Sequence, residues 1–370
     1  MTRRTSAAWP LFCIYAVLIV YASLYPFENW RFQGVVSWSF LTASWPRYWT
    51  GFDVLSNVLG YAPLGFLLAL SLHRTRPHWP AVLLATLFAG LLSFSLESLQ
   101  MFLPVRVPSN VDMALNVLGA GAGAVVARGL AWVGLMGRWS RFRDRWFASE
   151  AGGALALLAV WPLALMFPAP VPFGLGQVLE RLEAAWVQML RDTPWLESWP
   201  VRDVEFQPML PVTEMVCVAL GLLLPCLLAY GVVQRRAQRW VLAAVCLLLG
   251  LLASALSAAL TYGPVHAWGW VGPEVFKGVL LALFLALVLS WASSRLSWVL
   301  ALAALVLQLS LLNTTSADAY FPLTLQTWEQ GRFIRFHGLI QWLGWLWPYA
   351  LLVYLVRQLS MAHPGRRDGG

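Results

Sequence analysis

Residues 94–119 read FSLESLQMFLPVRVPSNVDMALNVLG, and this stretch decides how the first third of the chain folds. Apolar residues dominate both ends, and Pro104 and Pro108 bracket Arg106 in the middle. Proline stiffens a turn and interrupts a helix, because its ring fixes the backbone and removes a hydrogen-bond donor. The stretch therefore predicts two antiparallel helices, over 79–103 and 109–136, joined by the tight hairpin LPVRVPSN.

The composition of the whole chain is typical of a membrane protein. Of its 370 residues, 59% are apolar and 11% are charged, whereas soluble domains average about 45–50% apolar and about 25% charged residues. A net charge of +8 would favour nucleic-acid binding only if the basic residues clustered on one surface, and here they separate apolar runs. We expect an all-α, polytopic transmembrane helical bundle whose partners include membrane lipids and no nucleic acid.

Ten apolar segments are candidate spans, since a membrane-spanning helix needs about 20 mostly apolar residues. The first follows a basic N-terminus without a clear cleavage site, which favours an uncleaved helix over a signal peptide. The ten segments are 8–26, 52–72, 79–103, 109–136, 151–168, 211–233, 239–262, 272–292, 296–313 and 338–358.

Basic residues give the expected orientation of these segments. Every second junction is rich in arginine, as in HRTRPH at 73–78 and GRWSRFRDR at 137–145. The positive-inside rule places these junctions, and both chain termini, in the cytoplasm. The opposite loops are rich in tryptophan, phenylalanine and proline, and aromatic rings favour the headgroup level of a bilayer.

One of the opposite loops, 169–210, contains an amphipathic segment. In LGQVLERLEAAWVQMLR (175–191), apolar side chains recur at roughly helical spacing with charges between them. This pattern is typical of a helix lying in the membrane interface. A soluble loop helix packed on the protein would show the same pattern, so both interpretations stay open.

Cysteine and metal chemistry are not expected. The four cysteines lie inside apolar runs, and their spacing matches no metal site or disulfide framework. We interpret them as small buried hydrophobic residues and expect no metal and no cofactor. They are Cys13, Cys217, Cys226 and Cys246.

Polar residues recur at helical spacing on both sides of the hairpin. Glu97 and Gln100 are three apart on the first helix, and Asp112 and Asn116 are four apart on the second. Such pairs share one helix face. A charge at membrane depth costs about 2.5–3.5 kcal/mol on insertion scales, so these residues are expected to be paired or functional.

A third helix, 52–72, carries a further polar face, and the small residues GAGAG at 119–123 would let neighbouring helices approach closely. We therefore predict one outward-facing ligand-binding pocket. Its predicted residues are Asp53, Asn57, Tyr61, Glu97, Gln100, Arg106, Ser109, Asp112 and Asn116.

Structural roles are the alternative for the same residues. Ser109 and Asp112 fit a capping box at a helix start. Arg106 could face lipid headgroups from the loop, and Glu97 could be a structural partner of Arg106 or Asn116. Amide side chains often join helices by hydrogen bonds in membranes, which is the alternative for Asn57 and Gln100.

The same positions resemble the VanZ-like family of bacterial membrane proteins. The family pattern pairs N-x5-PLG-F with E-x2-Q-x3-P-x-R-x2-S-x2-D-x3-N-x2-G. Here NVLGYAPLGF (57–66) and ESLQMFLPVRVPSNVDMALNVLG (97–119) match it, and the resemblance covers roughly residues 8–130. It implies a multi-pass protein of the bacterial cytoplasmic (inner) membrane. The family's namesake is associated with teicoplanin resistance, and the family has no agreed catalytic residues.

The resemblance divides the chain into a VanZ-like four-helix domain, 1–148, and an additional region of about six helices, 149–370. The segment 90–105 aligns with 250–265, 160 residues later, which indicates either a degenerate duplication or the chance similarity of apolar helices. The second region has its own polar candidates at membrane depth, and two of them, three residues apart, are expected to pair with each other. These candidates are Glu214, Glu274, Lys277 and His337.

Three classes of function follow from these features. The leading hypothesis is a binding or protective protein that recognises an amphiphile, either a lipid-linked glycan precursor or a glycopeptide-type antibiotic, with Arg106 on a phosphate. An intramembrane enzyme would use Glu97 and Asp112 as general acid and base, although the sequence shows no complete catalytic constellation. A transporter or flippase would fit the many spans, but the predicted polar set is confined to the outer half.

Overall fold

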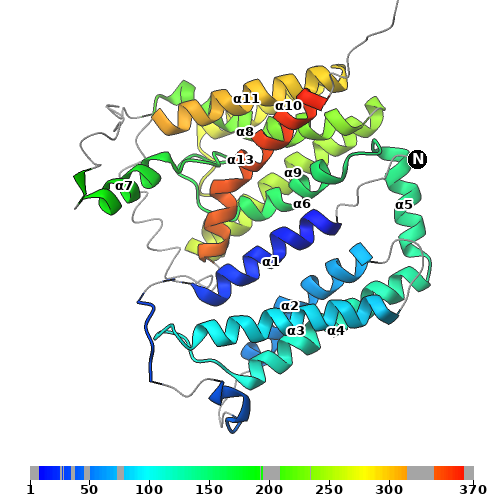
Figure 1. Ribbon diagram of the computed structural model, residues 1–370. Helices are drawn as coiled ribbons and strands as arrows, with labels where there is room; N and C mark the ends of the chain where they lie inside the picture. Colours follow the sequence, from blue (N-terminus) through cyan, green and yellow to red (C-terminus); the bar gives the residue numbers. More distant parts are fainter. Residues whose placement is uncertain are drawn as a thin grey trace, which may run out of the picture. The chain divides into compact units, whose positions relative to one another are not determined.

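The computed structural model describes residues 8–25, 27, 29–34, 38–45, 51–72, 79–191, 193–194, 209–233, 235–314 and 337–361. The regular elements in these ranges are helices, which confirms the all-α class. The chain divides into two compact units, Met1–Arg145 and Trp146–Gly370. Figure 1 labels the helices of both units.

The first unit contains four apolar helices, and α2 packs most extensively against α4. Helix α1 lies against α2 and α3, and its Phe12 joins Leu64 of α2 and Leu96 of α3 in a buried core. The predicted hairpin between the third and fourth helices is confirmed (Figure 1). The bounds are α1 (Ala8–Leu24), α2 (Gly51–Leu72), α3 (Trp79–Gln100) and α4 (Asn110–Trp132).

A fifth helix, α5 (Leu135–Trp146), follows α4 and was not expected. The sequence reading continued the fourth span to 136 and treated 137–145 as an arginine-rich junction. In the structure α4 ends at Trp132, and Gly134 adopts a positive φ of 74° that turns the chain. Helix α5 then runs across the direction of α4 (Figure 1). Its exposed Trp139 and its arginines are typical of a helix at a membrane surface.

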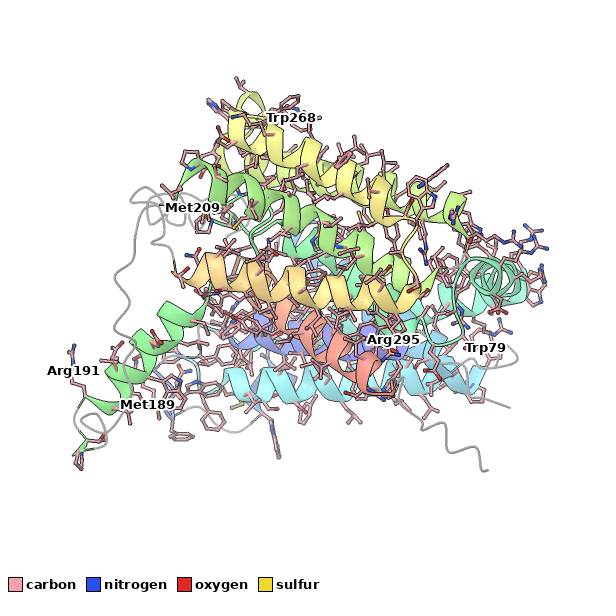
Figure 2. The ribbon with its side chains drawn as sticks, turned by 90° about the horizontal axis from the view of Figure 1, so that it is seen from above. Trp79, Met189, Arg191, Met209, Trp268 and Arg295 are labelled. Carbon is pink, nitrogen blue, oxygen red and sulfur yellow. The ribbon has the colours of Figure 1, made fainter. Side chains whose placement is uncertain are left out.

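The second unit is built around α8 (Pro211–Val232), which packs against α9, α10 and α11. Its side chains from Cys217 to Val232 are almost all buried. Figure 2 shows Met209 and Trp268 at one end of these helices and Arg295 at the other. The remaining helices are α6 (Gly152–Ala164), α7 (Leu179–Leu190), α9 (Arg236–Tyr262), α10 (Pro273–Leu289), α11 (Ser294–Thr314) and α13 (His337–Met361).

Helices occupy all ten predicted positions, but their lengths correct the count of spans. Within the described residues, six helices are long and apolar enough to cross a membrane, namely α2, α3, α4, α8, α9 and α11. Helices α1 and α6 are apolar but shorter, with 17 and 13 residues. The protein is therefore an all-α, multi-pass membrane protein with six candidate spans plus shorter apolar helices.

The predicted fifth span, 151–168, is where sequence and structure differ most. Helix α6 ends at Ala164, and residues 165–178 continue without helix although most of them are buried. Non-helical backbone at membrane depth is tolerated only where it is buried in protein or lines a cavity, because lipid cannot accept its hydrogen bonds. Three prolines, at 168, 170 and 172, explain why the helix cannot continue.

Side chains from α11 satisfy the backbone of this non-helical segment. The Gln308 Nε2 donates to the carbonyl oxygens of Phe173 and Cys217, each at 3.2 Å. The Asn313 Nδ2 donates to the Gly176 oxygen at 3.3 Å, and its Oδ1 accepts the Leu179 amide at 3.2 Å. The segment 165–178 is therefore fixed by specific hydrogen bonds.

We expect Gln308→Leu to destabilise the second unit by about 2 kcal/mol, because the buried carbonyls of Phe173 and Cys217 would lose their donor. The control is Ser310→Ala on the exposed face of the same helix, which should change stability by less than about 0.5 kcal/mol. Denaturant unfolding in mild detergent measures both. Equal stability of the two variants would contradict this role of Gln308.

The amphipathic segment predicted at 175–191 does form a helix, α7. Figure 2 shows Met189 and Arg191 at its far end, away from the other helices of the second unit. Met189 is strongly exposed. The position of α7 in a membrane interface stays a prediction.

Candidate functional site

The hairpin between α3 and α4 is fixed by hydrogen bonds at the start of α4. Ser109 is the N-cap residue, and its Oγ accepts the Asp112 amide at 3.2 Å, as the capping pattern predicts. The Glu97 Oε2, from α3, accepts the Ser109 amide at 2.8 Å. An anion is favoured there, because the first amides of a helix point outward with a partial positive charge. The hairpin thus holds Glu97 at the start of α4.

A close approach of α2 and α4 brings a second polar pair together. A Cβ at Gly119 or Gly123 would overlap the backbone carbonyl of Val58 or Ala62, so only glycine permits this spacing. Between the same two helices, the Asn57 Nδ2 donates to the Asp112 Oδ1 at 2.9 Å. The predicted role of GAGAG in close packing is confirmed.

A third contact lies deeper between α3 and α4. The buried Asn116 donates from Nδ2 to the Ser93 Oγ at 3.0 Å. The buried Tyr61 of α2 lies beside Ser93. The Asn116 Oδ1 is buried and has no hydrogen-bond partner in the described part of the chain. Buried polar atoms in native structures are nearly always paired, so this acceptor needs an explanation.

Asn57, Glu97, Asp112 and Asn116 form what we call the acceptor cluster. The cluster contains two carboxylates, and Glu97 is only 5% exposed, with Asp112 close enough for their charges to repel. An ionised carboxylate offers about four acceptor positions, and the Ser109 amide fills one of those on Glu97. Among the described contacts, the Asn116 Oδ1 is the buried acceptor of this cluster that lacks a donor.

Two of the predicted site residues bond backbone carbonyls at the end of α1. The Arg106 guanidinium donates to the Tyr25 oxygen, at 3.1 and 2.9 Å, and to the Ala22 oxygen at 3.1 Å. The Gln100 Nε2 donates to the Ser23 oxygen at 3.0 Å. The last carbonyls of a helix have no partners within it, so both side chains cap α1.

The predicted site is thus partly assembled. Asn57, Glu97, Ser109, Asp112 and Asn116 lie around the start of α4, and Tyr61 lies beside Ser93. Sequence reasoning missed Ser93, because a serine in an apolar helix carries no distinguishing signal. The Asp53 side chain lies outside the described residues.

The loop after α1 covers the hairpin. The Arg31 amide donates to the Phe102 oxygen at 2.9 Å, and the Gln33 Nε2 donates to the Met101 oxygen at 2.9 Å. The Asn110 Nδ2, at the start of α4, donates a hydrogen bond to the Ala43 oxygen in this loop at 2.8 Å. Large apolar side chains are exposed around these contacts, as expected at a headgroup level. They are Trp30, Phe32, Trp38, Trp45, Phe102, Val105 and Val107.

Comparison with known families gives a match within the first unit. The family model described as VanZ/LLP1 matches residues 11–133, which include all but the first residues of α1 and the whole of α2 to α4. No curated protein and no solved structure matches the chain significantly.

Proposed function

We propose that the VanZ/LLP1 domain of this membrane protein, residues 11–133, binds the polar head of an amphiphile at the acceptor cluster. The amphiphile is a lipid-linked glycan precursor or a glycopeptide-type antibiotic. Its hydroxyl or amine groups donate to Glu97, Asp112 and Asn116, while its apolar part lies along the exposed apolar side chains of the hairpin.

The buried Glu97 carboxylate and the buried Asn116 Oδ1 near the start of α4 are the observation that carries this proposal. The nearby donors, Arg106 and Gln100, are directed at α1 carbonyls. The Asn116 Oδ1 is buried without a partner in the described residues. A ligand rich in donors, such as a sugar, would complete these hydrogen bonds, whereas a phosphate would meet two carboxylates. The sugar or peptide part of the head is therefore the recognised part.

The arrangement of charge supports a location for this site. The arginines of α5 follow α4, and so lie at the end of the first unit opposite the hairpin. The positive-inside rule puts such arginines in the cytoplasm. In our proposal the protein lies in the bacterial inner membrane, with the acceptor cluster open to the outer leaflet.

We expect the double substitution Glu97→Gln and Asp112→Asn to lower the amount of co-purifying amphiphile at least about ten-fold. Removing two charge-assisted acceptors weakens binding by at least about 1.4 kcal/mol, because each such hydrogen bond contributes about 1.5–3 kcal/mol. Mass spectrometry of lipids bound to the protein purified in nanodiscs measures this. The amide side chains keep the shape and the internal hydrogen bonds of Glu97 and Asp112.

The matched control is Asp144→Asn, which removes one carboxylate from α5 at the opposite end of the same unit. It should carry the wild-type amphiphile. Gel filtration and thermal unfolding identify any variant that fails to fold. If well-folded wild type and double variant carried the same bulk lipids, the acceptor cluster would be structural only and the proposal would be wrong.

The two carboxylates also favour a second candidate function, acid–base chemistry on the bound head. Glu97 is buried beside Asp112, and neighbouring carboxylates in different surroundings are a common acid–base pair. Glu97→Gln alone would then abolish turnover of the bound amphiphile while leaving most of its binding. Unchanged mass of the bound amphiphile over time in wild-type protein would exclude this candidate.

A further inference from the structure

A cavity of about 310 Å³ lies in the second unit, outside the VanZ/LLP1 domain. One wall is the buried non-helical segment 165–178, and the others come from the start of α8, the end of α9 and the connection to α10. Interrupted helices in membrane transporters mark binding sites, because their freed backbone lines a cavity. The cavity therefore lies against the buried non-helical backbone of this unit.

Aromatic side chains line this cavity and are held in place. Phe173 and Trp270 meet edge to face with ring centroids 5.5 Å apart, and the Trp270 Nε1 donates to the Ala267 oxygen at 2.9 Å. Phe173 has a positive φ of 63°, a conformation that costs free energy in a bulky residue. Gln308 holds that backbone by donating to the Phe173 oxygen. Such strain at a cavity wall is typical of a binding site.

The charge at the cavity is negative. Glu214, in the first turn of α8, lines the cavity and interacts electrostatically with Glu274 of α10. The Lys277 Nζ forms an ion pair with the Glu274 Oε1 at 2.8 Å, which confirms the pairing predicted from their spacing. Lys277 is thus paired with Glu274, and the Glu214 carboxylate supplies negative charge to the cavity lining.

Two hydroxyl groups that line the cavity present acceptors as well. The Ser257 Oγ donates to the Met166 oxygen at 2.6 Å, and the Thr261 Oγ1 donates to the Ser257 oxygen at 2.8 Å. Because the hydroxyl hydrogens of Ser257 and Thr261 are used within the protein, only their oxygen lone pairs are available to a ligand. Together with the Glu214 carboxylate, these two oxygens favour a ligand that donates hydrogen bonds or carries positive charge.

From these contacts we infer a second binding site, for an organic ammonium ion. Its nitrogen lies between the Glu214 carboxylate and the faces of Trp270 and Phe173, since aromatic faces attract such cations. Its apolar substituents fill the part of the cavity lined by Phe167 and the prolines of the non-helical segment. The ammonium group belongs either to a free amine or to the headgroup of an aminolipid.

The test measures binding of choline to the full-length protein in phosphatidylglycerol nanodiscs by isothermal titration calorimetry. The comparison ligand is the uncharged choline analogue in which carbon replaces nitrogen. We expect choline to bind and the analogue to bind at least about ten-fold more weakly. We expect Glu214→Gln to weaken choline binding about ten-fold. Ala258→Trp should abolish it by filling the cavity, because Ala258 is a lining residue.

Glu150→Gln is the matched control, because Glu150 precedes α6 and the cavity lies beyond the other end of that helix. It should bind choline as the wild type does. Equal binding of choline and its uncharged analogue would overturn the proposal, as would full binding by well-folded Glu214→Gln.

Nanodiscs with added phosphatidylethanolamine distinguish the two sources of the ammonium group, a free amine and an aminolipid headgroup. Competition with choline there indicates an aminolipid headgroup, and unchanged choline affinity indicates a free amine.

Discussion

Replacing Gly119 and Gly123 together with alanine should destabilise the first unit by about 4 kcal/mol. A methyl group at either position would overlap the backbone of α2, at Val58 or Ala62. Backbone cannot rotate aside as a flexible side chain can, so α2 and α4 would have to separate. Overpacking a buried site costs about 1–3 kcal/mol, and two such sites lie on the same interface. Denaturant unfolding in detergent measures the loss.

The control for this prediction is Gly129→Ala on the same helix, where a Cβ would meet nothing within 4 Å. Alanine favours a helix over glycine by about 1 kcal/mol, so this variant should be as stable as wild type or more stable. The double variant should also lose ligand, because Asn57 and Asp112 would no longer meet. Wild-type stability of the double variant would show that α2 and α4 are further apart than described here.

Arg106→Met should destabilise the first unit by about 3 kcal/mol. The guanidinium donates to two carbonyls at the end of α1, and these would lose a charged partner while remaining partly buried. Hydrogen bonds to charged groups contribute about 1.5–3 kcal/mol each, and unpaired buried carbonyls add a penalty. The expected signature is loss of α1 packing, detected by hydrogen exchange of the α1 amides.

Two further variants test whether geometry or charge at Arg106 matters. Arg106→Lys keeps the positive charge near the end of α1, but a lysine cannot donate two parallel hydrogen bonds as the planar guanidinium does. We therefore expect Arg106→Lys to lose about half as much stability as Arg106→Met. Arg31→Met removes an exposed arginine from the same end of the unit and should have little effect. If Arg106→Met were fully stable and only ligand binding fell, Arg106 would be a ligand contact, as the sequence alone indicated.

The positions of the ten apolar helices followed from the sequence, because apolar runs and arginine-rich junctions are local patterns, whereas α5 was not expected. The hairpin at Pro104 and Pro108 and the close packing of Gly119 and Gly123 followed for the same reason. The length of α6 did not, since the apolar composition of 151–168 conceals the point where prolines end the helix. Hydropathy measures how apolar the side chains of a segment are, and it does not show whether the backbone of that segment is helical.

The partners of the polar side chains could not be predicted from sequence. Arg106 and Gln100 share the hairpin with Glu97, yet they bond carbonyls of α1, more than 70 residues earlier. Arg239 repeats this behaviour in the second unit. It is 5% exposed and donates to Val233 and Ser290 at the ends of α8 and α10, although its position suggested a cytoplasmic charged junction. Such bonds depend on tertiary contacts, which local patterns do not encode.

The most direct test of the acceptor cluster compares two ligands that differ only in the sugar. Binding of a polyprenyl-phosphate-linked sugar and of the sugar-free polyprenyl phosphate is measured on the purified protein in nanodiscs. We expect at least about ten-fold tighter binding of the sugar-bearing lipid, with this preference lost in Glu97→Gln combined with Asp112→Asn and kept in Asp144→Asn. Equal affinity for the two lipids, with affinity lost in Arg106→Lys instead, would show that the phosphate is recognised and would contradict recognition of the sugar at the acceptor cluster.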